Sequence, residues 1–331
     1  MRLIQLLDGR GVRRVGVVDG DRLRLIAPYA SVFALANAAL QAKQPLAGFA
    51  ERHVTDDSLS YDDVYAGRSE WRVLPAADHP DEPARCLISG TGLTHRRSAE
   101  QRQAMHAAGD TPTDSFRMYM LGEEGGRPAP GTIGTSPEWF YKGTGLSLRG
   151  HGDPLTVPSY AEDGGEEPEI AGVYLIDAQG TPRRLGMAIG NEFADHRLEQ
   201  RNYLYLAHSK LRECAIGPEL VLDPPFDAVN GQVSIERDGQ VLWSREIRTG
   251  GANMCHSLAN MEHHHFKYDV HRRPGDVHVH FFGADAFSFG AGLTLEDGDV
   301  MVVVFEGFGT ALRNPVRVGR RAEGLVEVRP M

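Results

Sequence analysis

The feature that most constrains this chain is a pair of acidic residues directly before an apolar run. Glu167 and Glu169 stand two apart, and residues 170–176 follow as an apolar run. Residues two apart in a strand point to the same face, so this run predicts a strand with both carboxylates on one face. A second apolar run at 185–189 predicts the return strand, and Glu192 follows it. Like charges on one face repel each other unless a cation lies between them.

The carboxylates of Glu167, Glu169 and Glu192 therefore predict a site for one hard cation. All-oxygen ligation favours Mg²⁺, Mn²⁺ or Ca²⁺ over zinc. The alternative is an acidic turn without a metal, since Asp163, Glu166 and Glu167 by themselves would make an ordinary solvated loop.

Four short motifs stand in a fixed order through this region. They are the E-x-E of Glu167 and Glu169, the G-N-E that ends at Glu192, Lys210 eighteen positions later, and the Gly-Pro at 217–218. This order resembles the fumarylacetoacetate hydrolase superfamily, and more narrowly its sugar-acid branch. The resemblance extends over nearly the whole chain and implies that the three glutamates bind Mg²⁺. Most of the superfamily has Asp where this chain has Glu192, so the longer side chain changes the reach of that ligand.

The segment 137–142 reads Pro-Glu-Trp-Phe-Tyr-Lys. It resembles the superfamily's P-x-x-F-x-K strand, and the dehydratases of 2-keto-3-deoxy sugar acids carry a P-E-x-F-F-K form whose Glu transfers protons. The resemblance implies catalytic roles for Glu138 and for Lys210, which stands at the position of the superfamily's site lysine. Alternation puts Glu138 and Lys142 on one strand face, where we expect Lys142 to bind substrate. The alternative is a plain salt bridge between Glu138 and Lys142.

A short apolar strand at 85–89 leads into the sequence Gly-Thr-Gly-Leu-Thr-His, which ends at His95. This segment resembles the superfamily's G-x-N-Y-x-x-H, whose catalytic His is followed three residues later by a Glu. Here that position is Ser98 and the nearest acid is Glu100, so His95 is a catalytic candidate that lacks the family's partner. The alternative is structural, with Ser98 as the cap of a helix that ends at Gly109.

Residues 110–136 are rich in Gly, Pro and Thr and predict a long loop. Long loops in compact domains are often binding loops, and a guanidinium there can hold a substrate carboxylate through two parallel hydrogen bonds. Arg117 is the candidate for that contact, with Arg127 as a second. The alternative is a subunit-contact loop with solvated arginines.

Hairpin and helix signals predict an α+β chain that is mainly β. Two pairs of β-rich runs flank Asp-Gly turns at 19–20 and 238–239. Ser31 predicts the N-cap of a short helix, and residues 199–210 predict another helix with an apolar stripe.

A stretch rich in proline and acids at 75–83 predicts a linker between two domains. We therefore expect a small β-rich N-terminal domain at 1–80, a catalytic domain at 81–318 and a tail at 319–331. The resemblance alone implies that the catalytic domain is a β-roll and that the protein is a homodimer or homotetramer.

Composition argues against several other classes of protein. The chain of 331 residues has a net charge of −10 and no basic stripe with interleaved aromatics, so we expect no nucleic-acid partner. No apolar run reaches the roughly 18 residues of a membrane span, and no apolar signal segment opens the chain. The cysteines are odd in number and far apart, which predicts reduced thiols in a cytoplasmic protein: Cys86, Cys214 and Cys255.

Seven histidines lie between His256 and His280 and raise the alternative of a zinc site. Three of them, His263, His264 and His265, are consecutive, so a helix would point them in different directions. We therefore expect no zinc site there.

A cation held by three carboxylates with open positions can chelate the carboxylate and keto oxygens of a 2-oxo acid and stabilise an enolate. With a base at C3 and an acid at the C4 hydroxyl the result is dehydration, whereas an activated water gives C–C hydrolysis. We predict a Mg²⁺-dependent dehydratase of a 2-keto-3-deoxy sugar acid, such as the arabinonate, that forms 2-oxoglutarate semialdehyde. The alternatives are a C–C hydrolase of a 2,4-diketo acid and a non-catalytic sugar-acid-binding protein.

Overall fold

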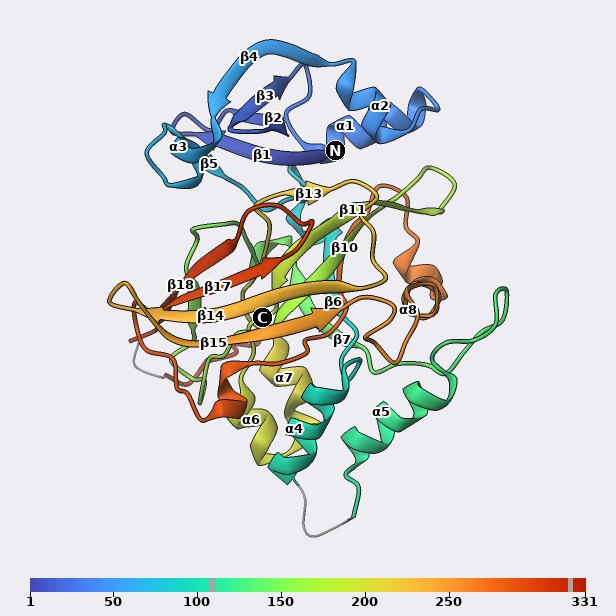
Figure 1. The fold of residues 1–331 in the computed structure, drawn as a ribbon, viewed down its shortest axis with the longest axis vertical. Helices are drawn as coiled ribbons and strands as arrows, with labels where there is room; N and C mark the ends of the chain where they lie inside the picture. The colour runs from blue at the N-terminus through green and yellow to red at the C-terminus, as the bar shows by residue number, and fades with distance from the viewer. Residues whose placement is uncertain (107–110, 321–323) are drawn as a thin grey trace.

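The computed structural model describes residues 1–106, 111–320 and 324–331. Within these ranges the chain forms a thirteen-stranded mixed sheet, a five-stranded sheet and eight short α-helices (Figure 1). Strands hold more of these residues than helices do, which confirms the predicted α+β, mainly β class. None of the described helices is long and apolar enough to cross a membrane.

The strands of the larger sheet are β1 (Arg2–Asp8), β2 (Arg13–Asp19), β3 (Arg22–Ile26), β4 (Val54–Ser60), β5 (Trp71–Val73), β6 (Cys86–Gly90), β7 (Phe140–Thr144), β8 (Leu148–Arg149), β10 (Pro168–Ile176), β11 (Pro182–Asn191), β12 (Cys214–Ile216), β13 (Leu220–Val221) and β16 (Val277–Phe281). Those of the smaller sheet are β9 (Leu155–Val157), β14 (Val229–Arg237), β15 (Gln240–Thr249), β17 (Val300–Phe305) and β18 (Leu312–Val318).

The α-helices are α1 (Val32–Gln41), α2 (Leu46–Glu51), α3 (Tyr61–Tyr65), α4 (Arg96–His106), α5 (Asp114–Gly125), α6 (His196–Arg201), α7 (Leu206–Lys210) and α8 (Leu258–Phe266). Single 3-10 turns are η1 (Pro83–Arg85), η2 (Gly145–Ser147), η3 (Tyr203–Tyr205), η4 (Asp269–His271) and η5 (Ser288–Ala291).

The centre of the molecule is the antiparallel hairpin of β10 and β11, and β16 pairs with the other edge of β10. Every residue of β10 is buried. Its successive side chains enter different cores, because they point to opposite faces of the sheet. Ile170 packs with residues of β14 and β17, whereas Ala171 and Val173 pack with residues of α1 and α2.

The hairpin contains one bulge. Val173 pairs with Gly186 and Tyr174 with Arg184, so Leu185 is an extra residue on β11. The bulge divides the hairpin into a half next to its turn and a half at its open end, and each half keeps its own register.

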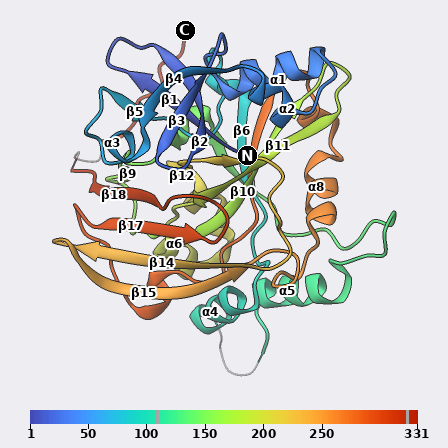
Figure 2. The same ribbon diagram turned by 45° about the horizontal axis from the view of Figure 1, so that its top comes forward.

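The other elements surround this hairpin. Strands β1–β5 and helices α1–α3 lie at one end of the molecule, and helices α4, α6 and α7 gather at the opposite end (Figure 1). Figure 2 shows the smaller sheet on one side of β10 and β11 and α8 on the other. The open end of the hairpin therefore meets the helices α4, α6 and α7.

The larger sheet runs without a break across the expected boundary near residue 80, because β1 pairs with β13. The fully buried Glu219 strengthens this junction. It accepts hydrogen bonds from Arg2 (2.8 Å), from the Tyr61 hydroxyl (2.5 Å) and from the backbone N–H of Thr310 (3.0 Å). The division into domains at 1–80 and 81–318 stays a prediction. The described residues after 318 have no regular secondary structure.

Several predicted elements are confirmed. The Asp-Gly turns connect β2 to β3 and β14 to β15. The Ser31 side chain caps α1 by accepting a hydrogen bond from the backbone N–H of Ala34.

Two predictions for local structure are wrong. The expected loop at 110–136 contains the twelve-residue helix α5, which Thr113 caps. The expected helix at 199–210 is broken into α6, η3 and α7, because Asn202 leaves the helical conformation. Leu204, which the apolar stripe would have buried, is 87% exposed.

Candidate metal centre and active site

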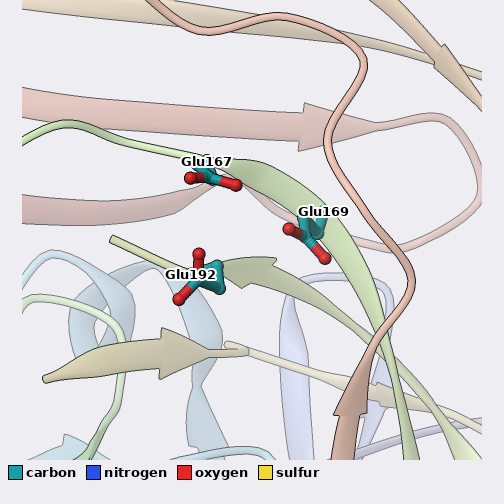
Figure 3. Close-up of side chains that lie close together, drawn as sticks. All are labelled: Glu167, Glu169 and Glu192. Carbon is teal, nitrogen blue, oxygen red and sulfur yellow. The ribbon is translucent and has the colours of Figure 1, made fainter. Parts of the chain in front are cut away.

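The open end of the β10–β11 hairpin brings the three predicted carboxylates together. Glu167 and Glu169 flank Pro168 at the start of β10, and Glu192 directly follows β11. The pairing of Pro168 with Asn191, and the hydrogen bond from the backbone N–H of Glu192 to the Glu167 carbonyl (2.9 Å), align the two strands. One oxygen of each carboxylate lies within 4.8 Å of the others (Figure 3). All three side chains are buried.

Glu169 shows why this cluster suits a cation. Its Oε2 accepts a hydrogen bond from the backbone N–H of Gly283 (2.6 Å), but its Oε1 has no hydrogen-bond partner among the described residues. Burial, together with the Glu167 and Glu192 carboxylates, raises the pKa of Glu169 well above its ordinary value. A buried carboxylate that faces two others is stabilised by a positive charge.

Charges of both signs meet around this site. Five carboxylates and three cationic side chains take part: Glu138, Glu167, Glu169, Glu192 and Glu199, with Arg102, Lys142 and Lys210. With all of them ionised the cluster has two negative charges in excess, which a divalent cation would balance. The oxygen ligands suit a hard cation of the Mg²⁺, Mn²⁺ or Ca²⁺ type.

Glu167 is oriented by three donors on one of its oxygens. Its Oε1 lies 2.6 Å from Lys210 Nζ, 3.0 Å from His196 Nε2 and 3.3 Å from Arg102 Nη2. Burial opposes ionisation, but Lys210 and Arg102 outweigh it and lower the pKa of Glu167 well below its ordinary value. Among the described residues these donors all act on Oε1, which leaves Oε2 for a cation.

The two lysines of the site differ in their surroundings. Lys210 Nζ lies between Glu167 and Glu192 Oε2 (2.5 Å), with Glu199 at 3.6 Å. Burial alone would lower the pKa of Lys210, but these carboxylates raise it above its ordinary value, so Lys210 is an ammonium ion. Burial lowers the pKa of Lys142, although Glu192 acts in the opposite direction.

Lys142 does not pair with Glu138, so the alternative of a Glu138–Lys142 salt bridge is wrong. Its Nζ lies 2.7 Å from Glu192 Oε1 and donates a hydrogen bond to the Phe193 carbonyl. The side chain is fully buried behind Glu192. This placement orients a carboxylate and does not support the expected contact between Lys142 and substrate.

Glu138 and Lys210 face one small pocket. The lining residues come from several elements and include two glycines. They are Gly92, Leu93, Ser98, Arg102, Glu138, Phe140, Glu167, Leu206, Lys210, Gly283 and Ala284. The Tyr203 hydroxyl donates a hydrogen bond to Glu138 Oε1 (2.6 Å). Burial raises the pKa of Glu138, whereas Tyr203, Arg102 and Lys210 act to lower it. The structure thus brings the predicted proton-transfer pair to the same pocket as Glu167.

His95 does not join this group. It is buried beside Thr94 and Thr249, whose hydroxyl oxygens lie 2.8 Å from Nδ1 and 3.1 Å from Nε2. Burial lowers the pKa of His95 to about 3. Helix α4 begins at Arg96, so Ser98 lies in its first turn and is not its cap. The expected helix end at Gly109 lies outside the described residues.

The two arginines proposed for the 110–136 segment lie elsewhere. Arg117 is exposed on α5 and pairs with Asp114 one turn away (2.9 Å). Arg127 donates a hydrogen bond to the Met254 carbonyl. Neither lines the pocket that holds Glu138 and Lys210. Their expected role in binding a substrate carboxylate has no support from this arrangement.

Arg102, His196, Glu199 and Tyr203 belong to the site but were missed from the sequence. Arg102 reaches Glu199 and Glu167 from α4, and Glu199 also accepts a hydrogen bond from Ser209 (2.6 Å). One signal was present for two of them. His196 and Glu199 are three apart in a helix that directly follows Glu192, so they share a face.

Among the described residues, the three glutamates are the one group of possible ligands whose atoms lie within 4.8 Å of one another, and no histidine between His256 and His280 belongs to such a group. His265 Nε2 lies 3.0 Å from His278 Nδ1. Both ring nitrogens of His280 lie 2.8 Å from hydroxyl groups, those of Ser89 and Thr91.

No protein-family model matches the sequence. Among curated proteins, the 2-dehydro-3-deoxy-D-arabinonate dehydratase of Saccharolobus solfataricus is 27% identical over 191 residues, which are 56% of this chain and 60% of that protein. The match therefore spans less than two thirds of that relative's length.

Solved structures give a longer match. A 2-keto-3-deoxy-D-arabinonate dehydratase complexed with magnesium and 2,5-dioxopentanoate has a TM-score of 0.71 at 20% identity, over 97% of this chain and 100% of that one. The 5-carboxymethyl-2-hydroxymuconate delta-isomerase of Mycobacterium smegmatis has a TM-score of 0.58 at 18% identity, over 96% and 100%. These similarities bear out the expected resemblance to sugar-acid dehydratases, and the structural matches show that the chain shares the fold of this dehydratase and of this isomerase.

Proposed function

We propose that the protein is a Mg²⁺-dependent dehydratase of a 2-keto-3-deoxy sugar acid. The substrate class is that of 2-keto-3-deoxy-arabinonate and related pentonates, and the product is 2-oxoglutarate semialdehyde, which is 2,5-dioxopentanoate. The observation that carries the proposal is the meeting of Glu138 and Lys210 at one pocket beside the three buried carboxylates. The names of the relatives, two of them dehydratases of this substrate class, support it.

Glu167, Glu169 and Glu192 are the proposed ligands of Mg²⁺. When bound, the cation would supply Lewis-acid polarisation of the keto and carboxylate oxygens of a 2-oxo acid. The lysines set the geometry of these ligands, since Lys142 and Lys210 each contact an oxygen of Glu192. Mn²⁺ or Ca²⁺ would meet the same oxygen ligands.

The chain's own residues then move two protons. One of Glu138 and Lys210 takes the C3 proton, and the C–H bonding electrons form an enolate across C2 and C3. The enolate collapses, the C4–O bond breaks, and the hydroxide leaves as water after it receives a proton from the other residue. Tautomerisation of the remaining chain, with no further loss of atoms, gives the C5 aldehyde. Lys210 is buried and Glu138 is half-buried, which limits the access of bulk water to these transfers.

C–C hydrolysis of a 2,4-diketo acid is the second function that this fold can host. It needs a base that activates water, and His95 was the candidate. Both of its ring nitrogens contact threonine hydroxyl groups. Three residues later, where the resemblance calls for an acidic residue, the chain has Ser98. We therefore rank hydrolysis below dehydration, and non-catalytic sugar-acid binding below both.

The test is incubation of the purified protein and Mg²⁺ with a panel of 2-keto-3-deoxy and 2,4-diketo-3-deoxy sugar acids. Mass spectrometry reads the products. Loss of one water supports the dehydratase, and two smaller acids would establish the hydrolase instead. Binding of Mg²⁺ and a sugar acid without any turnover would leave the non-catalytic function.

The same resemblance extends the proposal to assembly and compartment. We propose a homodimer or homotetramer that works in the cytoplasm in sugar-acid catabolism, with no nucleic-acid or membrane partner. Light scattering coupled to size exclusion measures the assembly, and a monomeric mass would contradict that part of the proposal.

A further inference from the structure

We infer that Tyr203 and Gly92 are positioning residues that hold Glu138 as the general base of the reaction. The inference rests on the proposed dehydration and assigns the two proton-transfer roles that the proposal leaves open. It gives the C3 proton to Glu138 and leaves Lys210 as the acid at the C4 hydroxyl.

Tyr203 fixes one oxygen of Glu138. It belongs to the 3-10 turn η3, which the Asn202 side chain caps by accepting a hydrogen bond from the backbone N–H of Leu204 (2.9 Å). From this turn the Tyr203 hydroxyl donates to Glu138 Oε1 at 2.6 Å. The hydroxyl that contacts Glu138 therefore comes from the turn between α6 and α7.

Gly92 leaves open the space that the other oxygen occupies. A β-carbon at position 92 would lie 1.9 Å from Glu138 Oε2, far closer than β-carbons approach other atoms. The φ angle of Gly92 is not positive, so space and not backbone conformation requires glycine there. Glu138 thus has Oε1 bound by Tyr203 and Oε2 in the space that a β-carbon at position 92 would fill.

The charges that face Glu138 come from every helix around the pocket. Arg102 on α4 and Lys210 on α7 favour its carboxylate form, and Glu199 on α6 opposes it. Burial raises the pKa of Glu138, and the hydrogen bond from Tyr203 is the largest influence that lowers it. A hydroxyl that donates to a carboxylate favours the ionised state, which is the state that a base needs.

The step that follows is balanced within the substrate and these two residues. Glu138 takes the C3 proton, and the electrons of the broken C–H bond form the C2–C3 double bond of the enolate while the keto electrons move to oxygen. When the enolate oxygen re-forms the C2 carbonyl, the electrons of the C2–C3 double bond form a C3–C4 double bond and the C4–O bond breaks. The hydroxide accepts a proton from the Lys210 ammonium and leaves as water.

Two substitutions test the inference, each with a matched control. Tyr203→Phe removes the hydroxyl and keeps the ring. Its control is Tyr61→Phe, because the Tyr61 hydroxyl also donates to a buried carboxylate, that of Glu219, at 2.5 Å and away from the site. Gly92→Ala should displace the Glu138 carboxylate, because the added β-carbon would occupy the space of Oε2. Its control is Gly9→Ala, where a β-carbon would meet nothing within 4 Å.

We expect kcat to fall roughly 10- to 100-fold in Tyr203→Phe, the range for losing a hydrogen bond to a charged group, and at least as far in Gly92→Ala. Mg²⁺ affinity by calorimetry stays at the wild-type value in both. In Tyr203→Phe the acidic limb of the kcat/KM profile moves to higher pH, because Glu138 becomes easier to protonate. A purely structural role of Tyr203 would lower thermal stability and leave this limb in place. The controls keep the wild-type kcat and profile.

A wild-type pH profile in Tyr203→Phe would overturn the inference, and movement of the basic limb instead would make Glu138 the acid. Carboxyl ¹³C NMR adds a readout without turnover, with the Glu138 signal assigned by its absence in Glu138→Gln. A higher titration midpoint of this signal in Tyr203→Phe supports the positioning role, and an unchanged midpoint overturns it. Should the wild type release no water from any sugar acid, the proposed function fails, and this titration still decides whether Tyr203 controls Glu138.

Discussion

The substitution Glu169→Gln separates a metal ligand from an ordinary buried acid. It keeps the shape of the side chain and removes one charge. The amide oxygen can still accept the hydrogen bond from the Gly283 N–H, so the amide nitrogen would take the place of Oε1, the oxygen with no partner among the described residues. An amide N–H cannot bind a cation, and two carboxylates remain.

The magnitude follows from the structure in two parts. Changes to residues that only support a ligand cost about 10- to 100-fold in metal affinity, so loss of the ligand itself should cost about 100-fold or more. At a Mg²⁺ concentration of about 100 times the wild-type Kd, the cation stabilises the wild type by about 2.7 kcal/mol. With about 100-fold weaker binding the same concentration stabilises the variant by only about 0.4 kcal/mol.

Without Mg²⁺ the order of stability reverses. The pKa of Glu169 is raised in the folded protein by burial and by Glu167 and Glu192. Such a group contributes stability below its unfolded pKa, and that contribution is lost as pH rises through the folded pKa. Glutamine is always neutral, so Glu169→Gln in EDTA should be more thermostable than the wild type at alkaline pH.

The assay is thermal unfolding in EDTA and in Mg²⁺, together with calorimetric titration of Mg²⁺. Glu166→Gln is the matched control, because the neighbouring Glu166 is equally buried but accepts hydrogen bonds from the backbone N–H (2.5 Å) and hydroxyl (2.7 Å) of Ser288. We expect the control to lose stability in both solutions and to keep its response to Mg²⁺. An unchanged Mg²⁺ affinity in Glu169→Gln would refute the reasoning.

Three further results are expected. Glu138→Gln should lower kcat by roughly 10²–10⁴-fold and leave Mg²⁺ affinity intact, and full turnover in this variant would move Glu138 out of the active site. Lys210→Met should lower kcat by a similar factor. It should also lower the thermal midpoint in EDTA, because it removes the ammonium group that Glu167 and Glu192 share. Burial lowers the pKa of His278 and His280 to about 3. Each should therefore remove about 1.4 kcal/mol of unfolding free energy per pH unit as the pH falls below about 6.5 toward about 3. Denaturant titrations in which His280→Gln does not reduce this dependence of stability on pH would contradict the reasoning. Burial raises the pKa of Cys214 and Cys255 to about 12, so iodoacetamide should label them slowly in the folded protein and dithiothreitol should leave the circular dichroism spectrum unchanged.

The carboxylate cluster was predictable because local patterns define it. Glu167, Glu169 and Glu192 lie at the end of one hairpin, and alternation along each strand decides where they point. The Ser31 cap and the Asp-Gly turns were found for the same reason, since each depends on a few adjacent residues.

The partners of the cluster were not predictable in this way. Arg102 reaches Glu167 across 65 positions of sequence, from a helix whose position depends on tertiary packing. Lys142 was predicted to bind substrate because the sequence indicates the strand face on which it lies. The sequence does not show that its partner on that face is Glu192. The break at Asn202 was missed because the apolar pattern of 203–207 is compatible with a helix, whereas the structure has a turn that Asn202 caps and from which Tyr203 contacts Glu138.

The bulge at Leu185 has a consequence for how this chain tolerates changes of length. The turn-side half and the open half of the β10–β11 hairpin differ in register by one residue. An insertion in the turn at 177–181 would stay within the turn, at the end of the hairpin remote from Glu167 and Glu192. Deletion of Leu185 would instead merge the two registers, and any slip at the open end would rotate Glu192 to the opposite face of its strand. Homologous chains should therefore vary in length at 177–181 and keep a constant count of residues from 185 to 192.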